Sequence, residues 1–191
     1  MKRIICFLLV LMLAALAGCS EKTESSSKAP ETEAATLAAY DFTPDPKSEY
    51  EYETREIWCE NNGNRIFGEA YIPKTDGAAR FPLIIHAHGM GSNHKAGAAY
   101  LKRYAEKGFA GYTFDFPGGS RPTTENKSNG DPMDMSPVTE ASDLQAILDA
   151  AMIWDFVDTD RIFLEGGSQG GLVAAMIGLD NTDKVKGMIL H

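Results

Sequence analysis

The chain has 191 residues, with 18 basic and 27 acidic side chains and a net charge of −9 at pH 7. Its apolar fraction of 43% and charged fraction of 24% are ordinary for a soluble globular protein, and the length is enough for one domain with a sizeable core. The acidic balance argues against a nucleic-acid partner, because such a partner would require a basic surface.

Residues 1–18 have the features of a bacterial lipoprotein signal peptide. Two basic residues precede an apolar run at 4–16 that is too short to span a bilayer as a helix. The sequence Leu16-Ala17-Gly18-Cys19 resembles a lipobox, which implies cleavage before Cys19 and lipid attachment to that cysteine. We therefore expect a membrane-anchored lipoprotein outside the cytoplasm, in a bacterial cell envelope. An ordinary secretory signal is the alternative.

Residues 19–52 are expected to form a flexible tether and lead-in. Residues 20–39 are rich in Ser, Thr, Glu, Lys and Ala and contain no aromatic residue, so they cannot bury enough apolar surface to fold. Residues 40–52 mix aromatic residues, prolines and acids and allow no firm assignment. The folded domain is expected to cover residues 53–191.

This domain is expected to open with a β-hairpin. Residues 54–60 and 65–72 are typical of strands, and Asn-Asn-Gly-Asn at 61–64 supplies the residues that tolerate positive φ in a tight turn. The continuous apolar run at 81–87 is typical of a central parallel strand. Further strands are predicted at 109–116, 161–164 and 185–190, and helices up to 107, at 138–155 and at 172–179.

Strands that alternate with helices after a hairpin predict an α/β fold with parallel central strands and flanking helices. The sheet is expected to end after about its sixth strand. Ligands then belong at the carboxyl ends of the strands, where three glycine-bearing loops lie, at 88–92, 115–120 and 166–171. The polar loop at 121–137 is long for a compact domain, and such loops often border binding sites.

Residues 166–170 form the pattern Gly-x-Ser-x-Gly, with Ser168 at its centre. A buried strand precedes this pattern and a buried helix follows it, as a nucleophile elbow requires. Gly166 and Gly170 would let the strand and the helix pass close together through a strained turn. The amide of Gln169, at the helix start, can point at a developing oxyanion. A glycine-rich loop that merely caps a helix is the alternative.

With these features the chain resembles the α/β-hydrolases, and more narrowly their cinnamoyl (feruloyl) esterase and serine aminopeptidase-like branch. The likeness covers about residues 54–191. It rests on the hairpin, on His-Gly-Met-Gly at 88–91, on Asp-Phe-x-Gly at 115–118 and on the elbow, in that order.

The resemblance implies that Ser168 is the nucleophile and that the backbone amides of Met90 and Gln169 form the oxyanion hole. This chain departs from many relatives at Gly167, where they carry His, and at 117–120, where they carry Gly-His-Gly. Both departures leave the substrate open.

A serine nucleophile also needs a general base, and the resemblance implies the order Ser, then Asp or Glu, then His. After Ser168 the only acids are Asp180 and Asp183, and the only histidine is His191. These residues come earlier than the family's acid and histidine. We therefore expect the triad acid and histidine to be missing, so that this chain is an inactive fragment of a hydrolase. A natural short protein is the alternative.

The remaining histidines have simpler expected roles. His86 is expected to be a strand residue, His88 to fix the oxyanion loop, and His94 to be solvated at a helix start. A metal site at His86 and His88 is a minor alternative, since no carboxylate accompanies them. No cofactor is expected, because the sequence has no phosphate loop, dinucleotide fingerprint or cysteine metal cluster.

The expected function is a serine hydrolase that cleaves carboxylic esters, of acyl or cinnamoyl type, through an acyl-Ser168 intermediate. The substrate would be a small-molecule ester. Two alternatives stay open: a serine peptidase that acts on short peptides, and a non-catalytic lipoprotein that serves as a binding module. The elbow does not separate esters from amides, because acyl transfer uses the same groups for both.

Overall fold

The computed structural model describes residues 40–121 and 124–191. The expected signal peptide at 1–18, the lipidation site at Cys19 and most of the expected tether lie outside the described residues. Within the described ranges, no helix is both long enough and apolar enough to cross a membrane.

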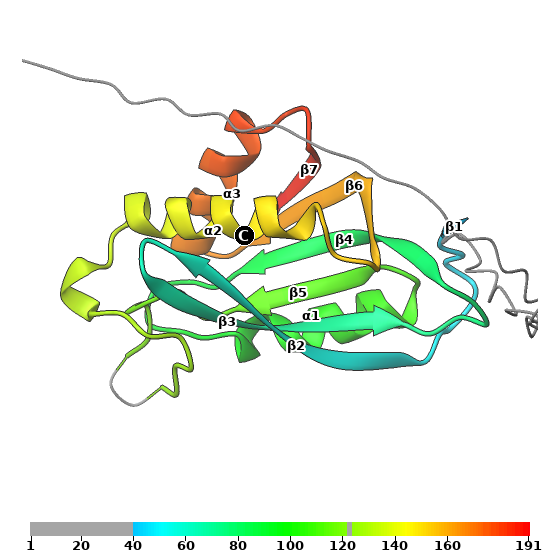
Figure 1. Cartoon of the computed structure of the whole chain (residues 1–191), viewed down its shortest axis with the longest axis horizontal. Helices are drawn as coiled ribbons and strands as arrows, with labels where there is room; N and C mark the ends of the chain where they lie inside the picture. The colour runs from blue at the N-terminus through cyan, green and yellow to red at the C-terminus, as the bar shows by residue number, and fades with distance from the viewer. Residues whose placement is uncertain (1–39, 122–123) are drawn as a thin grey trace, which may run out of the picture. The chain divides into compact units, whose positions relative to one another are not determined.

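One seven-stranded sheet organises the described residues, in the order β2-β3-β5-β4-β6-β7, with β1 paired to β4 outside this path (Figure 1). The pairs β2–β3 and β3–β5 are antiparallel, whereas β5, β4, β6 and β7 run parallel. The predicted α/β fold with an opening hairpin and parallel central strands is therefore confirmed. The strands are β1 Tyr40–Asp41, β2 Tyr52–Asn61, β3 Asn64–Pro73, β4 Ala79–Ala87, β5 Ala110–Phe114, β6 Val157–Gly166 and β7 Val185–Leu190.

Helices cover both faces of this sheet (Figure 1). Helix α1, Lys95–Glu106, buries Leu101 and Ala105 against Ile84 of β4. Helices α2, Pro137–Ala151, and α3, Gln169–Asp180, pack on the opposite face, which carries the larger core cluster. Alternate residues of β4 thus face different layers, as expected for a strand buried on both sides. The short 3-10 helix η1, Pro132–Asp134, precedes α2.

The hairpin turn follows the sequence prediction in detail. Asn62 and Gly63 have φ values of 48° and 80°, and Asn61 pairs with Asn64 across the turn. Two central residues with positive φ match the right-handed twist of the flanking strands. The turn therefore sets the register of β2 against β3.

Two boundaries differ from the predictions by four residues, and the other predicted elements by fewer. Helix α2 ends at Ala151 rather than at 155, and β6 begins at Val157 rather than at 161. The early part of β6 contains Asp158, which makes it unlike a buried strand in sequence. The structure shows how a strand accommodates this residue. Arg161 Nε donates to Asp158 Oδ2 at 2.5 Å, and the pairing with β4 shifts register there.

The lead-in before residue 53 packs on the sheet from residue 40 onward. Tyr40 N–H donates to Ala78 O, and Phe42 N–H donates to Arg80 O. The Phe42 ring lies 5.1 Å from the ring centroids of both Tyr50 and Phe81. The packed region therefore starts before residue 53. Aromatic residues of the lead-in, such as Phe42 and Tyr50, supply the burial that residues 20–39 lack.

Asp143 of α2 is a buried carboxyl whose pKa differs from its ordinary value. Burial raises its pKa to about 6, and the hydrogen bond from Asn61 Nδ2, at 2.8 Å, opposes this shift. The folded protein thus binds this proton more tightly than the unfolded chain, where the pKa is 3.8. The contribution of this carboxyl to stability is therefore most favourable below about pH 4 and is lost as the pH rises through about 6.

We expect Asp143→Asn to raise the free energy of unfolding by roughly 2 kcal/mol at pH 8 and to change it little at pH 4. The introduced amide keeps an oxygen that can accept from Asn61. Urea denaturation at the two pH values measures the difference. Asp149→Asn is the control on the same helix, because the hydrogen bond from Lys184 lowers the pKa of Asp149 and its removal should not stabilise the protein. An equal gain from Asp143→Asn at both pH values would contradict the account.

Candidate active site

Ser168 lies at a sharp turn between β6 and α3, with φ 52° and ψ −121°. A Cβ added at Gly166 would lie 2.3 Å from Gly170 O, and one added at Gly170 would lie 2.1 Å from Ala87 O. Both glycines are therefore required for the close passage of strand and helix, as expected for an elbow. Gly167 is different, because a Cβ there would meet no atom within 4 Å.

The end of β7 holds this turn through two backbone hydrogen bonds. Ser168 N–H donates to His191 O at 2.9 Å, and His191 N–H donates to Gly166 O at 3.0 Å. The strained backbone of Ser168 is thus fixed by the sheet as well as by the start of α3.

A residue with a side chain at φ 52° stores strain that glycine would relieve. We expect Ser168→Gly to be about 1 kcal/mol more stable than Ser168→Ala, since alanine keeps the strain and both lack the hydroxyl. Thermal and urea unfolding of the two variants measure this difference. Equal stabilities would show that the positive φ at this position costs nothing.

The loop after β4 lies directly against Ser168. A Cβ added at Gly89 would be 3.4 Å from Ser168 Cβ and 4.0 Å from Ser168 Oγ. Within the described residues, the amides of Met90 and Gln169 donate to no protein acceptor. Met90 is 62% exposed, and the group that it would supply to the site is its backbone amide. The structure thus brings together Ser168, Met90 and Gln169, the three residues assigned to the site from sequence.

His88 links the candidate oxyanion loop, residues 88–91, to the loop that follows β5. Its side chain is 1% exposed, its Nε2 accepts from Phe116 N–H at 3.2 Å, and its Nδ1 lies 2.8 Å from Gly89 O. Nδ1 must therefore carry the proton, and Nε2 accepts, so the hydrogen bonds define a neutral imidazole. Burial also lowers the pKa of His88. His88 fixes the loop, as expected, and has no nitrogen left to act on Ser168.

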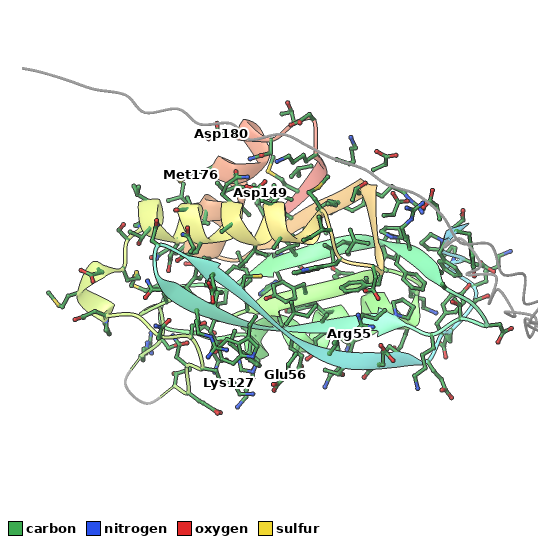
Figure 2. The ribbon with its side chains drawn as sticks, viewed as in Figure 1. Arg55, Glu56, Lys127, Asp149, Met176 and Asp180 are labelled. Atoms are coloured by element: carbon green, nitrogen blue, oxygen red, sulfur yellow. The ribbon has the colours of Figure 1, made fainter. Side chains whose placement is uncertain are left out.

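His94 is buried, which corrects the expectation that it is solvated. It is 4% exposed, and its Nδ1 and its backbone N–H each lie 2.7 Å from Asp115 Oδ1. The physical reason is Asp115, a buried carboxylate at the end of β5 that requires donors. The other Asp115 oxygen accepts from the backbone of Lys127, and the Lys127 ammonium lies 3.2 Å from Glu56 of β2 (Figure 2). These contacts anchor the long polar loop beside the site.

Helix α2 positions the first residue of α3. The Gln169 side chain donates from Nε2 to Glu140 Oε2 at 2.5 Å. Glu140 is buried, and burial raises the pKa of its carboxyl, while the Gln169 hydrogen bond lowers it. Because Gln169 directly follows Ser168, this side-chain contact helps to hold the backbone amide that would form half of the candidate oxyanion hole. Glu140 was missed in the sequence analysis, since a single acid on a helix usually faces solvent.

A cleft of about 760 Å³ opens above Ser168, at the carboxyl ends of β4 and β6. Ser168 Oγ forms no hydrogen bond with a histidine or an acid anywhere in residues 40–121 and 124–191. The described residues also contain no group of three metal-binding side chains. The cleft is lined by His86, Gly89, Met90, Ser92, Ala96, Tyr100, Arg121, Gly167, Ser168 and His191.

A buried carboxylate, Glu165 of β6, lies beneath this cleft. Its side chain is 0% exposed, with Oε2 3.4 Å from His86 Nδ1 and Oε1 3.1 Å from His191 Nε2. Burial favours the protonated acid, but the neighbouring imidazoles of His86 and His191 outweigh it and hold the pKa of Glu165 below its ordinary value. The sequence signal was available: an acid within an apolar strand, opposite a histidine of the neighbouring strand.

His191 therefore lies in the same cleft as Ser168, although its place in the sequence did not suggest this. Its ring stacks on that of Tyr100, with centroids 6.4 Å apart, and one nitrogen faces Glu165. Asp180 ends α3, away from these groups (Figure 2). The structure brings His191 to the cleft wall and leaves Asp180 outside it.

Comparisons with known proteins indicate the family and the fold. Residues 79–191 match the family model of serine aminopeptidase, S33. A hypothetical protein from Pseudomonas aeruginosa is similar at 24% identity and a TM-score of 0.63, over 78% of this chain and 46% of that one. Est1E from Butyrivibrio proteoclasticus, solved with ferulic acid bound, is similar at 25% identity and a TM-score of 0.61, over 69% of this chain and 50% of that one. No curated protein matches the sequence significantly.

A CIB-like hydrolase from Thermoplasma acidophilum is similar at 23% identity and a TM-score of 0.54, over 73% of this chain and 62% of that one. The chain spans about half the length of the first two structures, 46% and 50%. The family model matches residues 79–191, which make up more than half of this chain. We conclude that the chain belongs to the serine aminopeptidase S33 family of α/β-hydrolases.

Proposed function

We propose that the protein is a serine hydrolase that cleaves carboxylic esters through an acyl-Ser168 intermediate. The observation that carries this proposal is the position of Ser168 at a positive-φ elbow, against a loop whose Met90 amide has no protein acceptor in the described residues. Ser168 Oγ would attack the ester carbonyl, and the amides of Met90 and Gln169 would stabilise the oxyanion. The alcohol would leave, and water would release the acid.

The attacking hydroxyl must lose its proton to a general base. No histidine or acid of the described residues forms a hydrogen bond with Ser168 Oγ. We therefore propose that the triad acid and histidine come from a part of the protein outside this sequence. All activity measurements below accordingly use the full-length protein.

Ester cleavage is favoured over peptide cleavage by one relative, Est1E, which was solved with ferulic acid bound. The family description, serine aminopeptidase, supports the second candidate, a peptidase that acts on short peptides. The test compares p-nitrophenyl acetate, p-nitrophenyl butyrate and methyl ferulate with aminoacyl p-nitroanilides. We expect turnover of the esters at a kcat/KM at least tenfold above that of the anilides. Preference for the anilides would favour the peptidase, and turnover of neither class would favour a non-catalytic binding module.

We also propose that the protein is anchored in a bacterial cell envelope by a lipid on Cys19. The support is the lipobox-like sequence at 16–19 after a short apolar run. We expect Cys19→Ala to move the protein from the membrane fraction to the soluble fraction, because stable anchoring depends on the attached acyl chains. Detergent phase partitioning measures this shift, with Cys59→Ala as the control. An unchanged distribution of Cys19→Ala would contradict lipid anchoring.

A further inference from the structure

Arg121 lines the cleft above Ser168 but has no role in the chemistry proposed so far. Neighbouring backbone contacts hold it in place. The preceding residue, Ser120, forms a β-bridge with Gly91 and donates from its hydroxyl to Ser92 O at 2.7 Å. The carbonyl of Arg121 accepts from Thr124 N–H at 2.8 Å. The residue is thus attached to the oxyanion loop rather than to a separate surface.

The side chain of Arg121 passes over that loop. A Cβ added at Gly91 would lie 2.6 Å from Arg121 Cγ and 2.7 Å from Arg121 Nε. Gly91 follows Met90, whose amide is one of the two candidate oxyanion donors. The guanidinium therefore lies beside the place where the carbonyl group of a substrate would be held.

This guanidinium has no carboxylate partner in the part of the chain that the structure describes. The arginines that form salt bridges there are Arg55, Arg80 and Arg161. Among the described residues, no Asp or Glu lines the cleft, and Glu165 beneath it faces His86 and His191. In a chain with a net charge of −9, the described lining of the cleft thus presents the permanent positive charge of Arg121 and no carboxylate. A charge of this kind in a concave site attracts ligands of the opposite sign.

We propose that the substrate is an ester that also carries a carboxylate group, which Arg121 binds while the scissile carbonyl lies at Ser168. This inference rests on the proposed function. An arginine presents a planar fork of donors that matches the two oxygens of a carboxylate. The cleft volume of about 760 Å³ lies in the range of small-molecule sites.

The kinetic test uses two esters of the same shape, p-nitrophenyl hydrogen adipate and p-nitrophenyl methyl adipate. Only the first carries a negative charge. We expect the full-length protein to prefer the charged ester. Arg121→Gln should reduce kcat/KM for the charged ester by about tenfold or more, because a hydrogen bond to a charged group is lost. The loss should lie mainly in KM, since Arg121 does not touch the reacting atoms.

Two variants serve as controls. Arg121→Lys keeps the positive charge but lacks the planar set of N–H donors, and it should retain part of the preference for the charged ester. Arg80→Gln removes the same charge at the other end of β4, where Arg80 pairs with Asp41, and should leave the preference unchanged. Arg121→Gln should reduce kcat/KM for the charged ester at least about fivefold more than for the neutral ester, as expected for a contact that only the charged ester makes.

A binding measurement separates this inference from the proposed function, because it requires no turnover. Calorimetric titration of the Ser168→Ala protein with monomethyl adipate should give a Kd that Arg121→Gln raises about tenfold or more. If the protein turns over the neutral ester through Ser168 but shows no charge preference and no Arg121 effect, the inference is wrong and the proposed function stands. If neither ester is turned over, the proposed function fails, and an equal Kd in both proteins then overturns the inference independently.

Discussion

The Ser168→Ala variant of the full-length protein is expected to lose ester turnover by a factor on the order of a million in kcat, which is the loss seen when a nucleophile is removed from a complete triad. The hydroxyl is the only group at the elbow that can form the acyl bond. The surrounding geometry should survive, because alanine can adopt the conformation of Ser168 as well as serine does. Steady-state kinetics with p-nitrophenyl butyrate, together with thermal unfolding, measures both properties.

Ser142→Ala is the matched control, since Ser142 lies on α2 and its hydroxyl accepts from Asn61 at 3.0 Å, away from the cleft. It should keep wild-type kinetics. A Ser168→Ala variant that folds and retains more than about a thousandth of the wild-type rate would contradict a role for Ser168 as nucleophile, because that residual rate exceeds what binding and the oxyanion donors alone supply.

Gly170→Ala is expected to prevent stable folding, with a loss of at least about 4 kcal/mol in the free energy of unfolding. Its Cβ would lie 2.1 Å from Ala87 O and 2.5 Å from His88 O. Both contacts are with the backbone at the end of β4, a central strand held between β5 and β6. Neither atom can move away without breaking the sheet or displacing the oxyanion loop. Urea denaturation and the soluble yield measure the effect.

Gly167→Ala provides a control three residues earlier in the same turn. A Cβ at Gly167 meets nothing within 4 Å, so the expected change in the free energy of unfolding is within about 0.5 kcal/mol. Equal tolerance of Gly170→Ala and Gly167→Ala would contradict the close approach of α3 to β4. Equal damage from both would show that the turn depends on glycine for another reason.

The sharp turn at Ser168 and the loop after β4 could be predicted because each is contiguous in sequence. Gly166 and Gly170 are separated by a fixed number of residues, and the strand and helix beside them have clear apolar patterns. The hairpin turn at Asn62 and Gly63 was predictable for the same reason, since local backbone conformation selects those residue types. At these positions the local sequence alone was enough to predict the backbone conformation.

Other features depend on contacts between distant segments, which the pattern of one segment does not show. His94 is polar and follows a loop, so exposure was the natural prediction, but Asp115 requires it as a donor. His191 reaches the cleft because β7 pairs with β6 and ends beside Gly166. Arg121 comes from a polar loop, and its place above Gly91 depends on the bridge to Ser120.

The most direct test of the central claim is to treat the full-length protein with a fluorophosphonate and to locate the adduct by peptide mass spectrometry. These reagents form a stable bond with an activated serine. We expect one equivalent of label, on the peptide that contains Ser168, and no label in Ser168→Ala. Label on a different residue, or none on a folded protein that still turns over esters, would contradict the assignment of Ser168 as the nucleophile.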